Sequence, residues 1–132
     1  MRTRIVLTGI IRSKDLFLAV KRNENDDLFP GAWEFPGGHL EEGETLKEGL
    51  ARELKEEIGF DEEFVPIITH YTDEVKAKNN ELVHDLEIDF IINANKKDIT
   101  VVLSEEHCDY KWVKKDSDLL DEYIKLKLSN IE

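Results

Sequence analysis

The first part of the chain has the alternating and β-branched apolar positions that are typical of strands. Residues 4–11 form one such run, and residues 16–20 (LFLAV) form its partner after a polar turn. Further strands are predicted where short apolar runs are bounded by turn residues, at 33–35, 64–71, 82–93, 99–103 and 110–113. In the run 82–93, apolar residues alternate with Glu87 and Asp89, so we expect only one face of that strand to be buried.

The sequence marks both ends of one helix. Thr45 is an N-cap residue, and Glu48 completes a capping-box pattern three residues later. Gly59 is typical of the residue that follows the last helical turn. Between these ends, apolar residues recur at every fourth position and predict one buried stripe, made of Leu46, Leu50, Leu54 and Ile58.

A second helix is predicted near the end of the chain, at residues 117–128. Its expected packing face consists of Leu119, Leu120, Tyr123, Ile124 and Leu128. The order of elements is then strands, helix, strands, helix, which suggests an α/β fold with helices packed on a mixed sheet. The chain has 132 residues and contains neither repeats nor linkers, so we expect a single domain over residues 1–132.

Composition and charge narrow the function classes. The chain is 40% apolar and 36% charged, and no apolar run approaches the roughly 18–20 residues of a membrane helix. Its start is typical of a strand and a turn and not of a secretory signal, so we expect a cytoplasmic protein with no membrane partner. The single cysteine, Cys108, allows neither an intrachain disulfide nor a Cys-rich zinc site.

The formal net charge of −12 argues against binding to a nucleic-acid polymer, because the chain repels phosphates and has no basic stripe to offset this. A small phosphorylated ligand can still bind if metal ions bridge the like charges. The oligomeric state is left open, and a homodimer is one option.

Three acidic residues of the first helix suggest where such ions would bind. At about 100° per residue, Glu53, Glu56 and Glu57 share an arc that borders the apolar stripe instead of opposing it. Water is limited there, and each close pair of carboxylates costs about 1–4 kcal/mol at 4 Å. A hard divalent cation such as Mg²⁺ or Mn²⁺ neutralises such a cluster. An isolated acidic cluster on a helix can equally be a solvated face.

A fixed spacing distinguishes this cluster from an isolated one. Gly38 is followed after five residues by Glu44, and after seven more by RELKEEIGF at residues 52–60. This resembles the Nudix box, G-x5-E-x7-R-E-U-x-E-E-x-G-U, where U is a bulky apolar residue. All fixed positions match, although Phe60 stands where aliphatic residues are commoner. The lead-in at residues 33–37 and the strand pattern extend the resemblance more weakly. It implies a MutT-like Nudix hydrolase with a mixed β-sheet sandwiched between α-helices (α/β/α).

The resemblance implies metal-assisted attack of water on phosphorus, in a nucleoside diphosphate linked to another moiety. Glu56 and Glu57 would bind the catalytic Mg²⁺, for which Mn²⁺ could substitute. Glu53 would bind a second ion or orient the attacking water. The carbonyl group of Gly37 or Gly38 would add a further metal ligand.

Other residues of the box have supporting roles by the same resemblance. Arg52 would orient the glutamates, since a guanidinium can hold a carboxylate through two hydrogen bonds. Glu44 would be a structural partner of Arg52, although an exposed acid favoured by the helix dipole explains it equally well. Gly59 would end the helix.

A late loop offers a further glutamate. Residues 106–112 (EHCDYKW) resemble the E-H-x-x-Y-x-W element of several Nudix subgroups, which makes Glu106 the candidate base or extra metal ligand, slightly ahead of Glu105. An ordinary acidic loop is the alternative. His107 could act as a general acid or base near neutral pH, and a hydrogen-bonding role is the competing interpretation.

Residues that bind the substrate are harder to identify. Arg4 and Arg22 could meet phosphates or a base, although solvation at strand ends explains them equally. Phe29 and Tyr71 could stack on a base, and a core position is the alternative for each.

The leading functional interpretation is Mg²⁺-dependent hydrolysis of a small nucleotide substrate, with a nucleoside triphosphate giving the monophosphate and pyrophosphate. A second is hydrolysis of a dinucleoside polyphosphate or a nucleotide sugar, which would give two phosphorylated halves. A third, from another class, is a non-catalytic Nudix-fold binding or regulatory domain. Such domains typically lose glutamates of the box, and this chain keeps them all.

Overall fold

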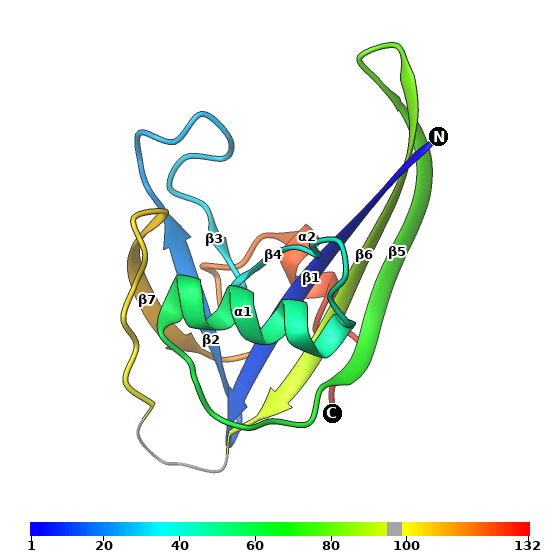
Figure 1. The fold of residues 1–132 in the computed structure, drawn as a ribbon. Helices are drawn as coiled ribbons and strands as arrows, with labels where there is room; N and C mark the ends of the chain where they lie inside the picture. Colours follow the sequence, from blue (N-terminus) through cyan, green and yellow to red (C-terminus); the bar gives the residue numbers. More distant parts are fainter. Residues whose placement is uncertain (95–98) are drawn as a thin grey trace.

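The computed structural model describes residues 1–94 and 99–132 (Figure 1). Its strands are β1 (Arg2–Ser13), β2 (Leu16–Arg22), β3 (Trp33–Glu34), β4 (Gly37–His39), β5 (Ile67–Lys78), β6 (Glu81–Asn93) and β7 (His107–Val113). Its helices are α1 (Leu46–Ile58) and α2 (Glu122–Leu126). The order of strands, helix, strands and helix is the one that the sequence predicts.

Strand β1 lies at the centre of the sheet. It pairs in parallel with β6 along its length, from Arg2 to Arg12, and β6 pairs antiparallel with β5. On its other side, β1 pairs antiparallel with β4 at residues 6–8 and with β2 at residues 12–13. Strand β2 in turn pairs with β3 and β7. Among the described residues, the seven strands therefore form one mixed sheet.

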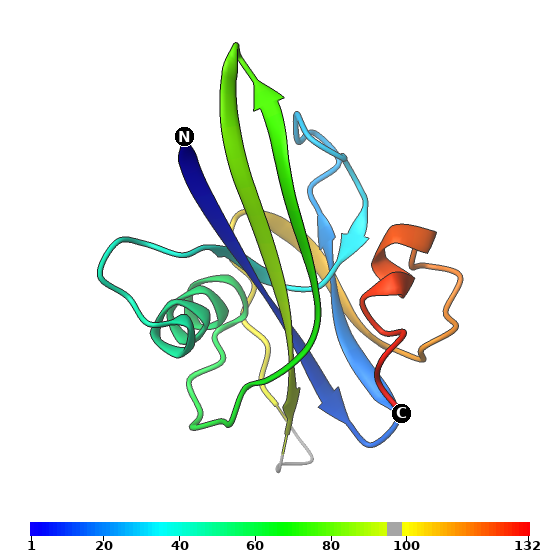
Figure 2. The same cartoon turned by 90° about the vertical axis from the view of Figure 1, so that its right-hand side faces the viewer.

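The two helices cover opposite faces of this sheet, as the view in Figure 2 shows. Each face has its own apolar core. The α1 side includes Leu7, Ile11, Leu18, Leu50, Leu54, Ile58 and Phe90, and the α2 side includes Ile10, Phe17, Phe35, Ile91, Leu120, Ile124 and Leu128. The predicted arrangement of a sheet sandwiched between helices is confirmed.

Helix α1 packs through the predicted stripe. Leu50, Leu54 and Ile58 are fully buried, while Leu46 at the first turn is partly buried. The helix approaches β1 closely at Gly9, where a Cβ atom would lie only 2.8 Å from Leu54 Cδ2. The lack of a side chain at this position thus sets how near the helix lies to the sheet.

Both predicted caps of α1 are present. The Thr45 hydroxyl accepts a hydrogen bond from the Glu48 amide at 3.1 Å, and the Glu48 carboxylate accepts one from the Thr45 amide at 2.9 Å. Gly59 adopts the left-handed conformation, with φ of 71°, and its amide donates to the carbonyl group of Lys55. The capping box and the glycine therefore define where the helix begins and ends.

Helix α2 is shorter than predicted. Residues 117–120 form a turn, and the helix starts only after Asp121, whose carboxylate accepts a hydrogen bond from the Ile124 amide at 2.9 Å. Aspartate is favoured at an N-cap and disfavoured inside a helix, because its short side chain accepts a hydrogen bond from a nearby backbone amide. Of the expected packing face, Leu120, Ile124 and Leu128 are buried, whereas Leu119 and Tyr123 are exposed.

The prediction of a strand at residues 99–103 is wrong. This segment forms no sheet ladder; instead the Val102 amide donates to the carbonyl group of Ile58 at 2.9 Å, and the Ser104 amide donates to that of Glu57 at 3.0 Å. The segment thus binds the unpaired carbonyl groups at the end of α1. Its alternating apolar residues pack on the α1-side core, which explains why the sequence looks like a strand.

Two other strand predictions need correction. The strand predicted at 33–35 ends at Glu34, and a further short strand that the sequence pattern does not predict, β4, begins at Gly37 and pairs with β1. Strand β6 was expected to bury one face, yet Asp89 on the second face is 1% exposed, because it receives a hydrogen bond from Lys127 at 2.9 Å. A buried polar group is tolerated where it has such a partner.

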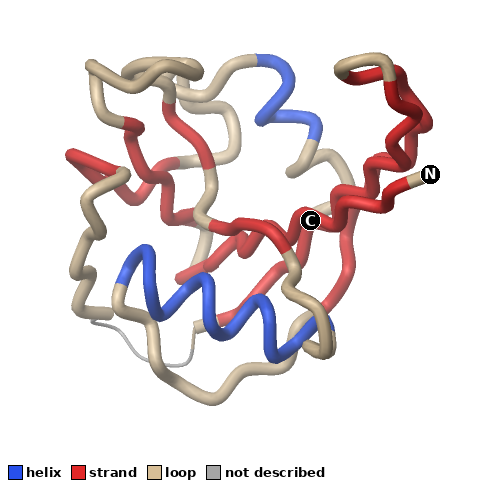
Figure 3. The backbone as a smooth tube through the Cα atoms, turned by 45° about the horizontal axis from the view of Figure 1, so that its top comes forward, coloured by secondary structure: helices blue, strands red, loops and turns tan. Residues whose placement is uncertain are grey.

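Strands β5 and β6 form a long hairpin, drawn in red beside the N-terminus in Figure 3, and its tip extends away from the two helices (Figure 1). Its turn is Asn79–Asn80, with φ of 53° and 64°, as expected for a two-residue turn that matches the twist of a hairpin. Strand β5 starts at Ile67, later than predicted, and Phe64 packs in the α1-side core ahead of it. Within residues 1–94 and 99–132, neither helix has the length and apolar character needed to cross a membrane.

We expect Thr45→Ala to lower the free energy of unfolding by about 1 kcal/mol, because it removes the hydroxyl that caps α1. Urea unfolding monitored by circular dichroism measures this change. Thr45→Ser keeps the hydroxyl and is the matched control, so a similar loss of stability in both variants would contradict the assignment of the cap.

Candidate active site

The acidic residues Glu53, Glu56 and Glu57 lie on one side of α1 but differ in burial. Glu57 is 7% exposed, and the Glu53 side chain is largely buried, whereas the Glu56 side chain lies in solvent. The expectation that all three lie where water is limited is therefore wrong for Glu56. This residue is farthest around the helix from the apolar stripe, so the sheet does not cover it.

Glu57 is a carboxylate held against the edge of the sheet. Its Oε2 atom accepts a hydrogen bond from the Gly37 amide at 3.1 Å. Burial raises the pKa of Glu57 to about 8, and this bond from Gly37 only partly offsets the effect. The negative charges of Glu106, Glu53 and Glu34 raise the pKa further, which shows that four acidic groups share this corner.

Arg52 links the start of the box to its helix. Its Nε and Nη2 atoms donate to the two oxygens of Glu44 at 2.7 and 3.0 Å, so the predicted pair is present. Its Nη1 atom donates to Glu53 at 2.8 Å and lies 3.5 Å from Glu56, and Nη2 also donates to the carbonyl group of His39. The bond to Glu44, followed by that to Glu53, raises the pKa of Arg52, which stays charged. The guanidinium therefore determines where both glutamates of the helix point.

Strand β4 comes unusually close to its neighbours because it starts with two glycines. A Cβ atom at Gly37 would lie 1.9 Å from the carbonyl oxygen of Leu7, and one at Gly38 would lie 2.4 Å from the carboxylate of Glu53. Any larger residue would displace the strand or the glutamate. The glycine pair thus allows backbone atoms to lie beside the carboxylates.

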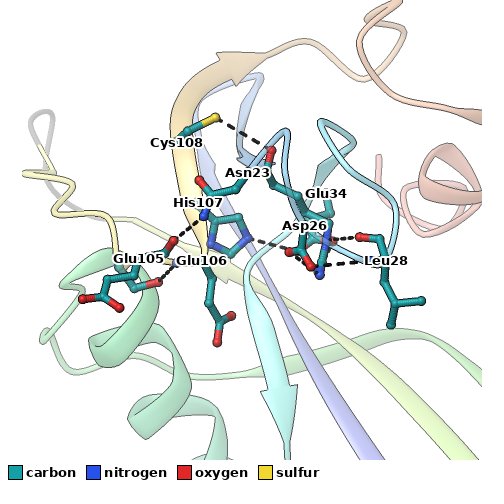
Figure 4. A network of polar contacts seen from close by, with 10 residues as sticks. Asn23, Asp26, Leu28, Glu34, Glu105, Glu106, His107 and Cys108 are labelled. Atoms are coloured by element: carbon teal, nitrogen blue, oxygen red, sulfur yellow. Dashed lines mark hydrogen bonds and ion pairs between the residues drawn. The ribbon is translucent and has the colours of Figure 1, made fainter.

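The loop that precedes β7 brings a further acid to this corner. Because residues 102 and 104 bind the end of α1, the side chain of Glu106 lies close enough to Glu57 to raise its pKa. Figure 4 shows the side chains of Glu105 and Glu106 pointing in different directions. Of the two predicted candidates, Glu106 is thus the one among the main charges that raise the pKa of Glu57.

Three strand ends meet next to this loop and form a network (Figure 4). The His107 Nε2 atom lies 3.0 Å from Glu34 Oε2, and Arg22 Nη1 lies 3.5 Å from both oxygens of Glu34. Arg22 also donates to Asp26 at 2.8 Å. The buried His107 has the hydrogen-bonding role that the sequence left open.

Glu34 is a residue of this network that no motif in the sequence marks. The available signal was its position in the predicted strand at 33–35, between the two aromatic residues Trp33 and Phe35. Only the pairing of β2 with β3 and β7 shows that it faces Arg22 and His107.

A cavity of about 310 Å³ opens beside β4 on the α2 side of the sheet. Two of the predicted substrate residues, Arg22 and Phe29, line it together with Trp33 and Glu34. Gly37 and Gly38 line it as well, so the cavity adjoins the backbone that contacts the α1 glutamates. A nucleotide bound here would have its phosphates within reach of that corner.

The structure separates the other two predicted substrate residues from this cavity. Arg4 lines a neighbouring cavity of about 480 Å³ under the β5–β6 hairpin and lies 3.6 Å from Asp85. Tyr71 is exposed on β5 and pairs with Ile88, which packs in the α1-side core. Paired residues of neighbouring strands point to the same face, so Tyr71 faces the α1 side of the sheet, whereas the cavity lies on the α2 side.

The acidic corner has the donor chemistry for a hard divalent cation. Its carboxylates are crowded, one of them is buried, and the backbone of β4 is close by. Within residues 1–94 and 99–132, however, no three acidic, histidine or cysteine side chains converge as a ready metal-binding group. Arg52 explains this, since it draws Glu53 and Glu56 toward itself.

A mixed sheet between two helix layers, with acidic residues of one helix beside a glycine strand and a cavity, is the arrangement that the resemblance to the Nudix box implies. The NUDIX domain profile matches residues 1–125, and the chain belongs to the Nudix hydrolase family. The family expected from the spacing of the box is therefore confirmed. Members of this family generally use a divalent metal ion.

Relatives support this assignment. The nucleoside triphosphatase NudI of Escherichia coli is 32% identical over 122 residues, which cover 86% of this chain and 84% of that protein. The MutT protein of Methanosarcina mazei is 30% identical, with a TM-score of 0.71 over 96% of this chain and 90% of that one. A MutT NUDIX hydrolase of Burkholderia pseudomallei shares the fold, with a TM-score of 0.78 at 21% identity over all of both chains.

We expect Glu57→Gln to stabilise the metal-free protein by about 1–3 kcal/mol at neutral pH, because Glu57, whose pKa is raised to about 8, must take up a proton on folding, whereas the amide of almost equal volume needs none. The same variant should lose most of the stabilisation that added Mg²⁺ gives to the wild type. Thermal unfolding with EDTA and with Mg²⁺ measures both effects. Glu63→Gln, which neutralises an exposed carboxylate, is the control. A Glu57→Gln protein that is less stable without metal would contradict the unfavourable burial.

Proposed function

We propose that this Nudix hydrolase cleaves nucleoside triphosphates to the monophosphate and pyrophosphate in a Mg²⁺-dependent reaction, with residues 1–132 acting as one domain. The observation that carries the proposal is the buried carboxylate of Glu57, which is held by Gly37 at the edge of the cavity of about 310 Å³. An anionic substrate is repelled by such a corner unless a cation joins them.

The roles of the acidic residues follow from where they lie. Glu53, Glu56 and Glu57, with a carbonyl group of Gly37 or Gly38, would hold the metal. A divalent cation there neutralises the phosphates and polarises their oxygens. Arg52 orients Glu53 and Glu56 through its hydrogen bonds and is itself oriented by Glu44.

The proposed base that activates water is Glu106. Its loop is bound to the last carbonyl groups of α1, which keeps Glu106 near Glu57. A base must lie within reach of the water that it deprotonates, and this docking keeps Glu106 beside the proposed metal ligands.

For the nucleotide, the proposal assigns Arg22 to the phosphates and Phe29 to the base or sugar, since both line the cavity beside Gly37. Arg4 would contact a ligand only in the neighbouring cavity. Tyr71 is left out of the proposed site because it faces the opposite side of the sheet.

The name of the Escherichia coli relative, nucleoside triphosphatase, supports a triphosphate substrate at 32% identity. A second candidate is a dinucleoside polyphosphate or a nucleotide sugar. The neighbouring cavity favours it, because the two cavities share Val6, Glu87 and Tyr123 and could hold the two halves of a longer ligand.

A substrate panel distinguishes these candidates. We expect Mg²⁺-dependent release of pyrophosphate from deoxynucleoside triphosphates, with no turnover in EDTA and recovery with Mg²⁺ or Mn²⁺. Chromatography of the products identifies the bond that is cleaved. Two phosphorylated halves from dinucleoside polyphosphates or nucleotide sugars, with no cleavage of triphosphates, would favour the second candidate.

The role of Glu106 has a matched control in its neighbour. We expect Glu106→Gln to lower kcat by about 10²–10⁴-fold with little change in KM, because it removes the base and no substrate contact. Glu105→Gln alters an adjacent exposed carboxylate and should leave kcat within about threefold of the wild type. Equal losses in both variants would contradict the assignment of the base.

A further inference from the structure

A charged group lines the cavity that opens beside β4. It lies on the wall of that cavity that is farthest from β4 across the sheet. The Glu87 carboxylate on β6 accepts a hydrogen bond from Lys127 at one oxygen and, at 2.9 Å, from the Tyr123 hydroxyl at the other. All three residues line the cavity. None of these three residues has a proposed role in catalysis or in metal binding.

Lys127 is fixed in place by a buried partner, Asp89, on the same strand as Glu87. Lys127 is 5% exposed and donates to Asp89 at 2.9 Å, and Asp89 also lies 2.9 Å from His70. Burial acts to lower the pKa of Lys127, but Asp89 and Glu87 outweigh it, so the ammonium group stays charged. Fastening α2 to the sheet does not by itself require charges, because well-packed apolar residues would do it at no greater cost.

The register of the sheet places this wall relative to the proposed phosphate end. Gly37 on β4 lies opposite Thr8 on β1, and Thr8 lies opposite Asp89 on β6. Neighbouring strands are about 4.8 Å apart, so the wall is roughly 10 Å across the sheet from Gly37. A nucleoside spans that separation when its phosphates lie at β4, which brings its base to Glu87 and Lys127.

The hydrogen-bonding capacity of the wall is specific. A carboxylate has about four acceptor positions, and Lys127 and Tyr123 use one on each oxygen of Glu87. Each oxygen can therefore accept another hydrogen bond. The ammonium group of Lys127 has three donors, of which Glu87 and Asp89 take two. Within residues 1–94 and 99–132, the wall thus leaves two acceptor positions and one donor for a ligand.

We propose that the Glu87–Lys127 pair is the base-reading wall of this enzyme and that it selects guanine. The 2-amino group and N1–H of guanine are adjacent donors for the carboxylate, and its O6 atom is an acceptor for the ammonium group. Adenine, cytosine and thymine lack two adjacent donors beside an acceptor on that edge. Phe29, Trp33 and Tyr123 in the same cavity supply aromatic surface for the face of the base. This inference rests on the proposed function for the position of the phosphates.

The test compares kcat/KM for dGTP, dITP, dATP, dCTP and dTTP with Mg²⁺. We expect dGTP to exceed dITP by about tenfold, because inosine lacks the 2-amino donor to the carboxylate. Glu87→Gln replaces one acceptor by an amide donor and should abolish this difference. Glu74→Gln neutralises a carboxylate of the neighbouring cavity only and should preserve it.

A second variant covers the case in which Glu87→Gln fails to fold. Tyr123→Phe removes only the hydroxyl that holds Glu87 and should reduce the preference for dGTP over dITP by about threefold, with an unchanged melting temperature. Binding of dGMP, dIMP, dAMP, dCMP and dTMP, measured by calorimetry, gives a readout that does not need catalysis. The same order of affinities is expected there.

The outcomes separate the inference from the proposed function. Equal cleavage of all five triphosphates, or an equal loss on all five in Glu87→Gln, would overturn the base-reading wall and leave the hydrolase proposal in place. Binding that prefers dGMP without cleavage of any triphosphate would support the wall and overturn the proposed substrate class. If no nucleotide is cleaved or bound, the result would overturn both the base-reading wall and the proposed function.

Discussion

The carboxylate of Glu57 lies between helix α1 and strand β4, and the arrangement of the site depends on keeping it there. A buried carboxylate among three other acids is unfavourable, as its raised pKa shows. The packing of α1 against β1 opposes this, with Leu50, Leu54 and Ile58 fully buried on the same helix. The apolar stripe therefore supplies the stability that lets a carboxyl group lie at the edge of the core.

Arg52 and the two glycines of β4 determine how the remaining acids are arranged around Glu57. The guanidinium holds Glu44 through two hydrogen bonds and draws Glu53 and Glu56 toward itself. Gly38 leaves room for the Glu53 carboxylate, which a Cβ atom would displace. The order seen in this cluster comes from one cation of the protein itself and from backbone that carries no side chain.

The two faces of the sheet carry different parts of the candidate site. The α1 face carries the acidic corner, and the α2 face carries the cavity with its aromatic residues and its charged wall. Strand β4 joins them, because Gly37 donates to Glu57 and also lines the cavity. A ligand that reaches across β1 would therefore contact the proposed phosphate-binding end and the proposed base-reading wall, which are built on different strands.

Local patterns in the sequence were sufficient for helix α1, its caps, its buried stripe and the spacing of the acids, because all of these lie within one continuous segment. They were not sufficient where a residue's environment comes from a distant part of the chain. Residues 99–103 look like a strand but bind the end of α1, and Asp89 looks solvent-facing but meets Lys127. Glu34 and the Glu87–Lys127 pair became visible only through strand pairing, since a single acidic or basic residue has no local signature of its partner. Which acids meet at the corner, and which wall closes the cavity, was decided by the tertiary structure, because both depend on contacts between residues far apart in the chain.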